Sequence, residues 1–539
     1  MTQNPSVSTD KSTASKPNIP LIFIALMITM LLASLSQTVL SSALPTIVGE
    51  LHGVEQMTWV ITAYMLASTV MMPVYGKIGD VLGRKPVLIA AILIFVGGGI
   101  LGGLAQNINL LIVARVIQGI GGGGLMILSQ AAIADVVSAR DRGKYVGILG
   151  GVFALSSVAG PLLGGWLTEG PGWRWAFWLN IPLGLVAVVA VTMLLHLPSR
   201  ARSEHQPKHD YSGMALIALA TTMVVLIGTW GGSTYDWGSP QILGLFAGSA
   251  IAIIAFIFNE KRAAEPIMPL EMFKEKNFNL TTIAGLLTAV VMFGTISYIP
   301  TYLQMAEGYD ATTAGLLMIP MMGALMSTSV VVGNLVSRTG RTRMFPIVGT
   351  VILAAGVFLL SRTTIDTPIV MICISLAVMG IGLGASMQVL TLVVQNSFPH
   401  RMVGTATAAN NYFRQVGGSV GAAVVGSVFA SSLTRLIAEK LPDGTGSTDG
   451  MSSLTPALVK TLPDAIRIPV IEAYNEALMP IIVFLIPLAL VSTVLLWMVE
   501  EKELATTIET EPESPSAVEA QEATPVQGAG REPARANVA

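Results

Sequence analysis

Charged residues and cysteine are both scarce in this sequence. Charged side chains make up 12% of the 539 residues, about half of the roughly 25% found in soluble domains. This is too little charge to cover the surface of a soluble protein of that size. The only cysteine, Cys373, excludes a scaffold held by internal disulfides. A formal net charge of −2 provides no basic field of the kind that attracts nucleic acid.

Apolar residues are abundant instead, and they predict an integral membrane protein. Hydrophobic residues make up 52% of the chain, and the mean hydropathy is +0.68. A helix of about 20 residues crosses about 30 Å of hydrocarbon, and apolar stretches of that length recur along the chain. We predict fourteen membrane spans, at about 20–42, 56–75, 86–105, 108–130, 145–167, 174–196, 212–230, 241–259, 279–302, 312–335, 344–361, 368–394, 403–430 and 478–498.

The positions of lysine and arginine predict the orientation of these spans. With the N-terminus in the cytoplasm, the loops after even-numbered spans carry most of the basic residues, as the positive-inside rule requires. We therefore expect both termini on the cytoplasmic side of the cytoplasmic (inner) cell membrane. The opposite side keeps only Arg174, Arg362, Arg435, Lys440, Lys460 and Arg467.

A repeated segment divides the chain into two halves. Residues 76–85 (GKIGDVLGRK) follow the second span, and residues 333–343 (GNLVSRTGRTR) follow the tenth. Ser337 stands in the second copy where the first has Asp80. Repeated halves in a protein with many spans are typical of secondary transporters, whose substrate site lies between the halves. The matching residues are Gly76 with Gly333 and Arg84 with Arg341.

The repeat and the span pattern predict the domain organisation. Both tails are polar and too poor in apolar residues to order. The predicted parts are a disordered tail at 1–19, a six-helix half at 20–196, a loop with two inserted helices at 197–278, a second six-helix half at 279–499 that includes an external loop at 431–477, and a disordered tail at 500–539.

Several motifs resemble the major facilitator superfamily, and the fourteen spans fit its drug:proton antiporter family. Residues 76–85 look like the signature loop between helices 2 and 3, Arg115 with Gln118 like the helix 4 motif, and residues 173–182 like the start of helix 6. The resemblance implies an all-α membrane protein with the major facilitator fold, in which two six-helix halves flank two inserted helices. The antiporter motif of helix 5 is matched by Gly147, Gly160, Pro161, Gly164 and Gly165.

The chain departs from that family in helix 1. Members usually carry a membrane aspartate there, often assigned to proton or cation handling, and this chain has Ser36 at that position. The residue that would carry a proton is therefore not identified by the resemblance, and a simple preference for cationic drugs is not implied.

The repeated segments are predicted to form a gate. Asp80 and Arg84 can pair across one helical turn, and Gly83 permits a tight turn. The resemblance implies that such groups hold the cytoplasmic side closed, whereas the alternative is topogenic charge beside an ordinary turn. The predicted gating residues are Gly76, Asp80, Gly83, Arg84, Lys85, Gly333, Arg338 and Arg341.

Two arginines are predicted to lie deep in the membrane, at Arg115 and Arg414. A guanidinium keeps its proton and needs a partner or a wet cavity there. No carboxyl group is expected at comparable depth, so one interpretation is an anionic, zwitterionic or lipid substrate that supplies the charge. The other is that carbonyls and the amides of Gln118, Asn410 and Asn411 satisfy both arginines.

For Arg115 the resemblance implies a coupling role, together with Gln118 and Asp135; the alternative is a structural arginine that snorkels.

For the helix 5 motif the resemblance implies a kinked, closely packed seam between the halves that favours export. The alternative there is generic packing of small residues.

Polar and aromatic side chains within the spans are candidates for substrate contact, although helix packing is the alternative for each one. The 27 methionines would suit an adaptable binding surface. The candidates are Ser36, Gln37, Tyr64, Phe293, Tyr302, Met387, Gln388, Asn410, Asn411 and Arg414.

These features predict an exporter of drugs or other amphipathic small molecules that works by alternating access in exchange for protons. Residues 121–124 (GGGG) lack the Lys-Ser/Thr ending of a phosphate loop, so ATP is not expected as a partner. No metal cluster, cofactor site or catalytic residue set is evident, so we do not expect an enzyme. The alternatives are an exporter of a lipid, siderophore or anionic metabolite, and a membrane sensor or scaffold that does not transport.

Overall fold

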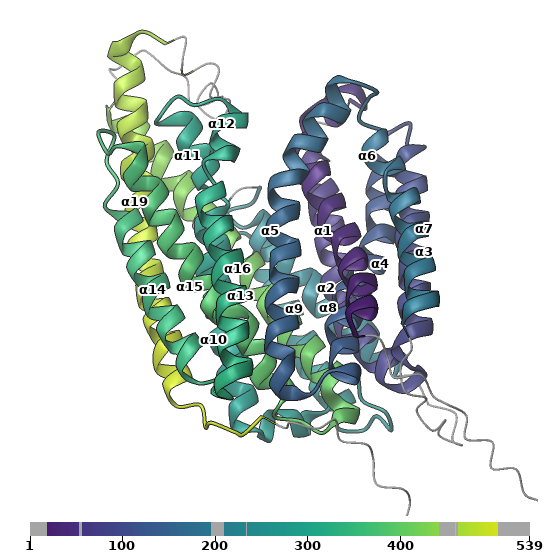
Figure 1. Ribbon diagram of the computed structural model, residues 1–539. Helices are drawn as coiled ribbons and strands as arrows, with labels where there is room; N and C mark the ends of the chain where they lie inside the picture. Colours follow the sequence, from purple (N-terminus) through teal and green to yellow (C-terminus); the bar gives the residue numbers. More distant parts are fainter. Residues whose placement is uncertain are drawn as a thin grey trace, which may run out of the picture.

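The computed structural model describes residues 19–52, 56–195, 210–232, 234–440, 459 and 462–504. These residues are arranged almost entirely in helices, most of which run along one common direction (Figure 1). Within this part of the chain, fourteen helical segments are long and apolar enough to cross a membrane. The predicted all-α class and the predicted number of spans are both confirmed.

The first half of the chain forms one bundle. Its spans are α1 (Ile19–Glu50), α2 (Met57–Leu82), α3 (Arg84–Gly103), α4 (Ile108–Val136), α5 (Ala139–Glu169) and the pair α6 (Trp175–Trp178) and α7 (Asn180–Leu194). Two further spans follow, α8 (Tyr211–Trp230) and α9 (Pro240–Glu260), and then a short 3-10 helix, η2 (Leu270–Lys274).

The last six spans form the second bundle. They are α10 (Lys276–Ile296) with α11 (Ile299–Met305), α12 (Ala311–Leu316) with α13 (Ile319–Thr339), α14 (Met344–Ser361), α15 (Ile369–Gln395), α16 (Val403–Lys440) and α19 (Asp464–Trp497). A 3-10 turn, η3 (His400–Met402), leads into α16.

Three of the predicted spans, 174–196, 279–302 and 312–335, each consist of two helices rather than one. In the last two, Pro300 and Pro320 lie in the first turn of α11 and α13. Proline is favourable there because the first N–H groups of a helix have no partner within it, whereas in a helix interior it breaks the hydrogen-bond ladder. Each proline therefore starts a new helix within its span.

The C-terminal end is more ordered than predicted. Both α16 and α19 extend into the range 431–477, because Lys440 at the end of α16 binds Glu472 and Glu476 of α19 at 3.1 and 2.8 Å. Residues 500–504, predicted to belong to a disordered tail, lie against the start of α10, where Glu500 accepts a hydrogen bond from Lys276 at 2.8 Å. The rest of both predicted tails lies outside the described residues.

Figure 1 shows the two bundles close together at the end that carries the α2–α3 turn and diverging toward the end that carries α6, α11 and α12. The basic segments 76–85 and 333–343 are both at the end where the bundles meet. By the positive-inside rule this is the predicted cytoplasmic end. We call it the basic end.

The inserted helix α8 contacts both bundles. The Thr221 hydroxyl of α8 is hydrogen-bonded to the Tyr412 hydroxyl of α16 at 2.7 Å. The Trp230 ring of α8 packs edge-on against Trp59 of α2, with 6.1 Å between ring centroids. Helix α8 therefore lies across the seam between α2 and α16.

Close packing of α3 on α4 gives a test of the fold. A Cβ atom at Gly121 would lie 2.5 Å from the backbone nitrogen of Phe95, whereas one at Gly165 would meet no described atom within 4 Å. We expect Gly121→Ala to destabilise the protein by about 2 kcal/mol, since the backbones must separate, and Gly165→Ala to have little effect. Thermal unfolding in detergent measures both; equal midpoints would contradict the α3–α4 packing.

Candidate functional site

The two bundles are joined at the basic end through the carboxylate of Asp80. Arg84 of α3 pairs with Asp80 Oδ1 at 3.1 Å. From the other bundle, the backbone N–H and the hydroxyl of Thr405 donate to Asp80 Oδ2 at 2.7 and 3.0 Å. Thr405 lies in the first turn of α16, where backbone N–H groups lack helical partners and the helix dipole favours an anion. Asp80 therefore binds the N-terminus of a helix in the opposite half.

Glycines give Asp80 this position. Gly83 has φ = 88°, a conformation that glycine adopts at low cost. It turns the chain so that Arg84 begins α3 one turn after Asp80. Gly76 packs directly on Ala408 of α16, and a Cβ atom at Gly76 would overlap it. The glycine-rich sequence thus brings α2 close enough to α16 for the hydrogen bonds to form.

A second carboxylate, Asp135 at the end of α4, extends this cluster. Arg84 pairs with Asp135 at 2.9 Å, and His400 of the opposite bundle lies 3.2 Å from the same carboxylate. Only 2% of Arg84 is exposed, and its guanidinium also donates to the Ala131 carbonyl. Because a buried charge left unpaired is strongly destabilising, removal of either acid would disturb the whole cluster. Asp80, Arg84, Asp135, His400 and Thr405 together are called the acidic latch below.

The second copy of the repeat makes a different contact, between α13 and α5. Arg140 of α5 donates to the carbonyls of Ser337 and Arg338, each at 3.1 Å. The Ser337 hydroxyl donates to Asp141 of α5 at 3.2 Å. The carboxylate that the second copy lacks is therefore supplied by the opposite half.

Two predicted gating residues do not take part in these contacts. The guanidinium of Arg341 forms no hydrogen bond or ion pair with the described residues, because Ser337 offers it no carboxylate of the kind that Arg84 finds in Asp80. Lys85 donates to the carbonyl of Thr192 at 2.8 Å, within its own half. Neither residue contacts the opposite half in this conformation, and a gating role for both stays a prediction.

Small residues bring α5 and α13 together. A Cβ atom at Gly143 would lie 3.0 Å from the Gly333 carbonyl oxygen, and one at Gly147 would lie 2.5 Å from that of Ser329. Contacts this close require residues without side chains. The seam between the halves thus includes the predicted residues Gly147 and Gly333.

The remaining residues of the predicted helix 5 motif lie elsewhere. Gly160 packs on Thr38, and Gly164 packs on Val39 and Ser42, all three on α1 of the same half. Gly165 faces no described atom within 4 Å, and Pro161 lies inside the continuous helix α5. Gly160 and Gly164 therefore pack within the first half in this conformation, because α5 contacts α13 near its start and α1 farther along, and the predicted role of the motif in export stays a prediction.

Arg115 is the centre of a polar network within the first half. It is 1% exposed, donates to Gln118 Oε1 at 2.6 Å and to the Val60 carbonyl at 3.2 Å, and lies 4.2 Å above the Tyr64 ring. Gln118 in turn donates to the Ser36 hydroxyl at 3.0 Å. Neutral groups on α1, α2 and α4 thus replace a carboxylate partner, and no ion pair to Arg115 is formed by the described residues.

Arg414 belongs to a network that crosses between the halves. Its guanidinium donates to the Asn411 side-chain oxygen, and the Asn411 amide donates to Gln130 of α4 at 3.1 Å. Asn410 donates to Thr282 of α10 at 3.3 Å. Both asparagines are 2% exposed. These two predicted substrate contacts therefore hold helices together in this conformation, and Arg414 has no carboxylate partner among the described residues.

The other substrate candidates are not gathered in one pocket. Tyr302 is 1% exposed and its hydroxyl accepts from Asn475 at 2.7 Å, which places it in the core of the second half. Phe293 packs against Gly418 of α16. A Cβ atom at Gly150 of α5 would lie 2.9 Å from the Gln388 amide, whereas Gln37 of α1 and Met387 of α15 are half-buried. Burial leaves Tyr302 no free surface in this conformation, and substrate contact by these residues stays a prediction.

The sequence does not predict the residues through which each half binds the other. Thr405, His400 and Gln130 belong to no motif, and each acts through a neighbour far away in the sequence. For Arg140 and Asp141 the sequence does indicate a position at the start of a helix, because Ser138 followed by Asp141 is typical of a helix N-terminus. Ser138 does cap α5.

Comparison with known proteins shows the family of this chain. Residues 26–422 match the model of the Major Facilitator Superfamily. The chain belongs to this superfamily. An uncharacterized MFS-type transporter of Mycobacterium tuberculosis (strain ATCC 25618 / H37Rv) is 39% identical over 485 residues, which cover 90% of this chain and 70% of that protein. The multidrug transporter protein MdtP of Bacillus subtilis (strain 168) is 35% identical, with 82% of this chain and 81% of that protein covered.

Solved structures show the same fold. The human organic anion transporter MFSD10 superposes with a TM-score of 0.61 at 13% identity, over 89% of this chain and all of that chain. The proton:xylose symporter XylE gives a TM-score of 0.55 at 16% identity, over 91% of this chain and 98% of that one. At these identities the likeness concerns the fold alone. The chain is thus a multi-pass membrane transporter by family.

Loss of the charge on Asp80 is expected to open the basic end. Met72 of α2 is 4% exposed and packs with Ala408 of α16, so in a Cys373→Ser background Met72→Cys reports on access to the seam between α2 and α16. We expect Asp80→Asn to raise its labelling rate by a water-soluble maleimide about tenfold, because charged hydrogen bonds between the halves are lost. Glu500→Gln removes an ion pair at the same end within one half and serves as the control. An unchanged rate in Asp80→Asn would contradict the acidic latch.

Proposed function

We propose that this protein exports amphipathic small molecules by alternating access, driven by exchange for protons. The observation that carries the proposal is the acidic latch, a set of contacts at one end of the molecule that joins the two halves and must break before that end can open. Relatives named multidrug transporter protein MdtP and multidrug resistance protein 3, the latter 30% identical over 91% of this chain, support the substrate class.

The latch has the properties that an alternating gate requires. Its hydrogen bonds run between the halves, from Thr405 to Asp80, whereas Arg84 pairs with Asp80 inside one half. When the halves separate, the carboxylate of Asp80 therefore stays paired with Arg84. The N–H groups at the start of α16, which lose their bond to Asp80, are then hydrated by water. Opening costs the contacts across the seam without stranding a buried charge.

Protons act on the same cluster in this mechanism. A proton on Asp80 would remove the negative charge that attracts the α16 N-terminus and would weaken the latch. Since Ser36 replaces the helix 1 aspartate of the family, Asp80 and Asp135 are the carboxyl groups that this proposal assigns to coupling. Arg115 and Gln118 then serve to hold α1, α2 and α4 as one unit.

A second candidate is export of an anionic or zwitterionic metabolite. Arg414 favours it, since its partner Asn411 is neutral and the hydrogen bond from Asn411 to Gln130 breaks when the halves separate. A guanidinium would then be left at membrane depth with only neutral partners, and a substrate anion would stabilise it.

Transport in proteoliposomes with an imposed pH gradient tests the proposal. We expect an amphipathic substrate to accelerate dissipation of the gradient, and Asp80→Asn to abolish this effect while Glu500→Gln retains it. Cationic, neutral and anionic amphiphiles, added in turn, rank the charge classes. Substrate movement that never dissipates the gradient would exclude proton exchange, and no movement of any class would favour a membrane sensor or scaffold.

Arg414 allows the two candidate substrate classes to be separated. If an anion binds there, Arg414→Gln should reduce uptake of anionic amphiphiles about tenfold or more while neutral ones are transported at the wild-type rate. Equal rates for every class in Arg414→Gln would rule out charge matching by this residue. Lys85→Gln, which changes a basic residue outside the seam, is the matched control.

A further inference from the structure

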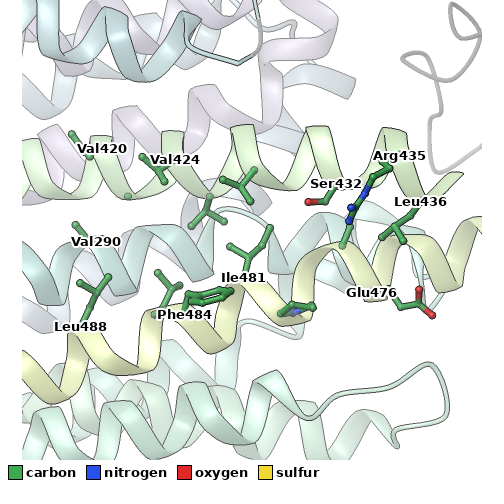
Figure 2. Close-up of a pocket in the computed structure, with 16 residues that line it drawn as sticks. Val290, Val420, Val424, Ser432, Arg435, Leu436, Glu476, Ile481, Phe484 and Leu488 are labelled. Atoms are coloured by element: carbon green, nitrogen blue, oxygen red, sulfur yellow. The ribbon is translucent and has the colours of Figure 1, made fainter. Parts of the chain in front are cut away.

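A groove of about 540 Å³ lies on the second half, away from the acidic latch. Figure 2 shows it between α16 and α19, with Val290 of α10 among its lining residues. Most of the lining side chains are aliphatic, with Phe484 as the one aromatic ring. Its volume is within the range of small-molecule sites, about 300–1,000 Å³.

The groove faces lipid along one leaflet. Its α19 residues run from Glu476 to Leu488, about 18 Å at 1.5 Å per residue. This matches the depth of hydrocarbon in a single leaflet, half of about 30 Å. Val424 and Phe484 are 45% and 75% exposed on segments that cross the membrane, so lipid chains surround the opening. Such a groove fits an acyl chain that lies along the membrane normal.

Polar groups are confined to the outer end of the groove, farthest from the basic end. Ser432 and Arg435 of α16 and Glu476 of α19 lie there (Figure 2). Lys440 already binds Glu476. The ion pair of Arg435 with Glu439 is 4.0 Å long, and both side chains are more than half exposed, so this pair contributes little. Arg435 is thus the cation that an incoming phosphate would meet.

The charge balance at this end selects among head groups. In the ion pairs that the described residues form here, three carboxylates, on Glu439, Glu472 and Glu476, contact two cations, Arg435 and Lys440. An anionic head group would add to this excess of negative charge. A head group with both a phosphate and an ammonium offers a partner to Arg435 and to Glu476 at once.

We propose that the groove is a binding site for one phospholipid with a zwitterionic phosphate–ammonium head group. An acyl chain lies between α16 and α19, the phosphate binds Arg435 and the ammonium lies beside Glu476. The site is built from residues outside the seam between the halves, so it stands whether or not the transport proposal holds.

Native mass spectrometry of the full-length protein in detergent tests the proposal, with a phosphoethanolamine lipid as the titrated probe. We expect one lipid to bind, about tenfold more weakly in Arg435→Gln. Val424→Trp fills the groove and should abolish binding. The controls are Arg467→Gln, at an exposed arginine of α19 paired with Asp464, and Val351→Trp, at an exposed site on α14. Both should bind lipid as the wild type does.

The outcomes separate this site from general lipid adhesion. Binding that Val424→Trp and Val351→Trp weaken equally would overturn the groove as the location. Tighter binding of a phosphoglycerol lipid, lost in Arg435→Gln, would overturn the zwitterionic head group. A melting temperature equal to wild type shows that each variant is folded, which keeps a loss of binding attributable to the groove.

Discussion

The arrangement of the two halves depends on one electrostatic contact, between a carboxylate and the start of a helix. Asp80 lies in the last turn of α2 in the first half, and the N–H and hydroxyl of Thr405 at the start of α16 donate to it. The free N–H groups of a helix N-terminus form a local positive site that needs no charged side chain. The contact is therefore strong enough to close one end of the molecule, and water can replace it when the halves part.

The two copies of the repeat bind the opposite half in different ways. The first keeps its acid and binds the opposite half through a charge. The second has lost the acid at Ser337 and instead accepts hydrogen bonds on its carbonyls from Arg140 of the opposite half. Gly143 and Gly333 bring the backbones into contact at this second seam. One seam is thus held by ions and the other by backbone packing, so a change in protonation would act mainly on the first.

The sequence predicts most of the fold because membrane spans are encoded locally. A run of apolar residues must form a helix in hydrocarbon, so all fourteen spans could be found from composition alone. The helix starts at Pro300 and Pro320 were not predicted, because the apolar run continues across each of them. The site was predicted less well. Asp80 and Arg84 stand one turn apart in a recognisable motif, whereas Thr405, His400 and Gln130 act only across the seam. Tyr302 and Asn410 were predicted to contact substrate because a polar atom within a membrane span needs a hydrogen-bond partner. In the structure each of them finds that partner on a neighbouring helix.

The inserted pair breaks the symmetry of the molecule. Helix α8 is hydrogen-bonded to Tyr412 of α16 and packs edge-on against Trp59 of α2, and no such element bridges α5 and α13 among the described residues. Because α8 contacts both sides, separation of α2 from α16 breaks either the contact between Trp230 and Trp59 or the hydrogen bond between Thr221 and Tyr412. Helix α8 therefore adds to the free energy needed to open the seam between α2 and α16, whereas the seam between α5 and α13 has no such additional contact among the described residues.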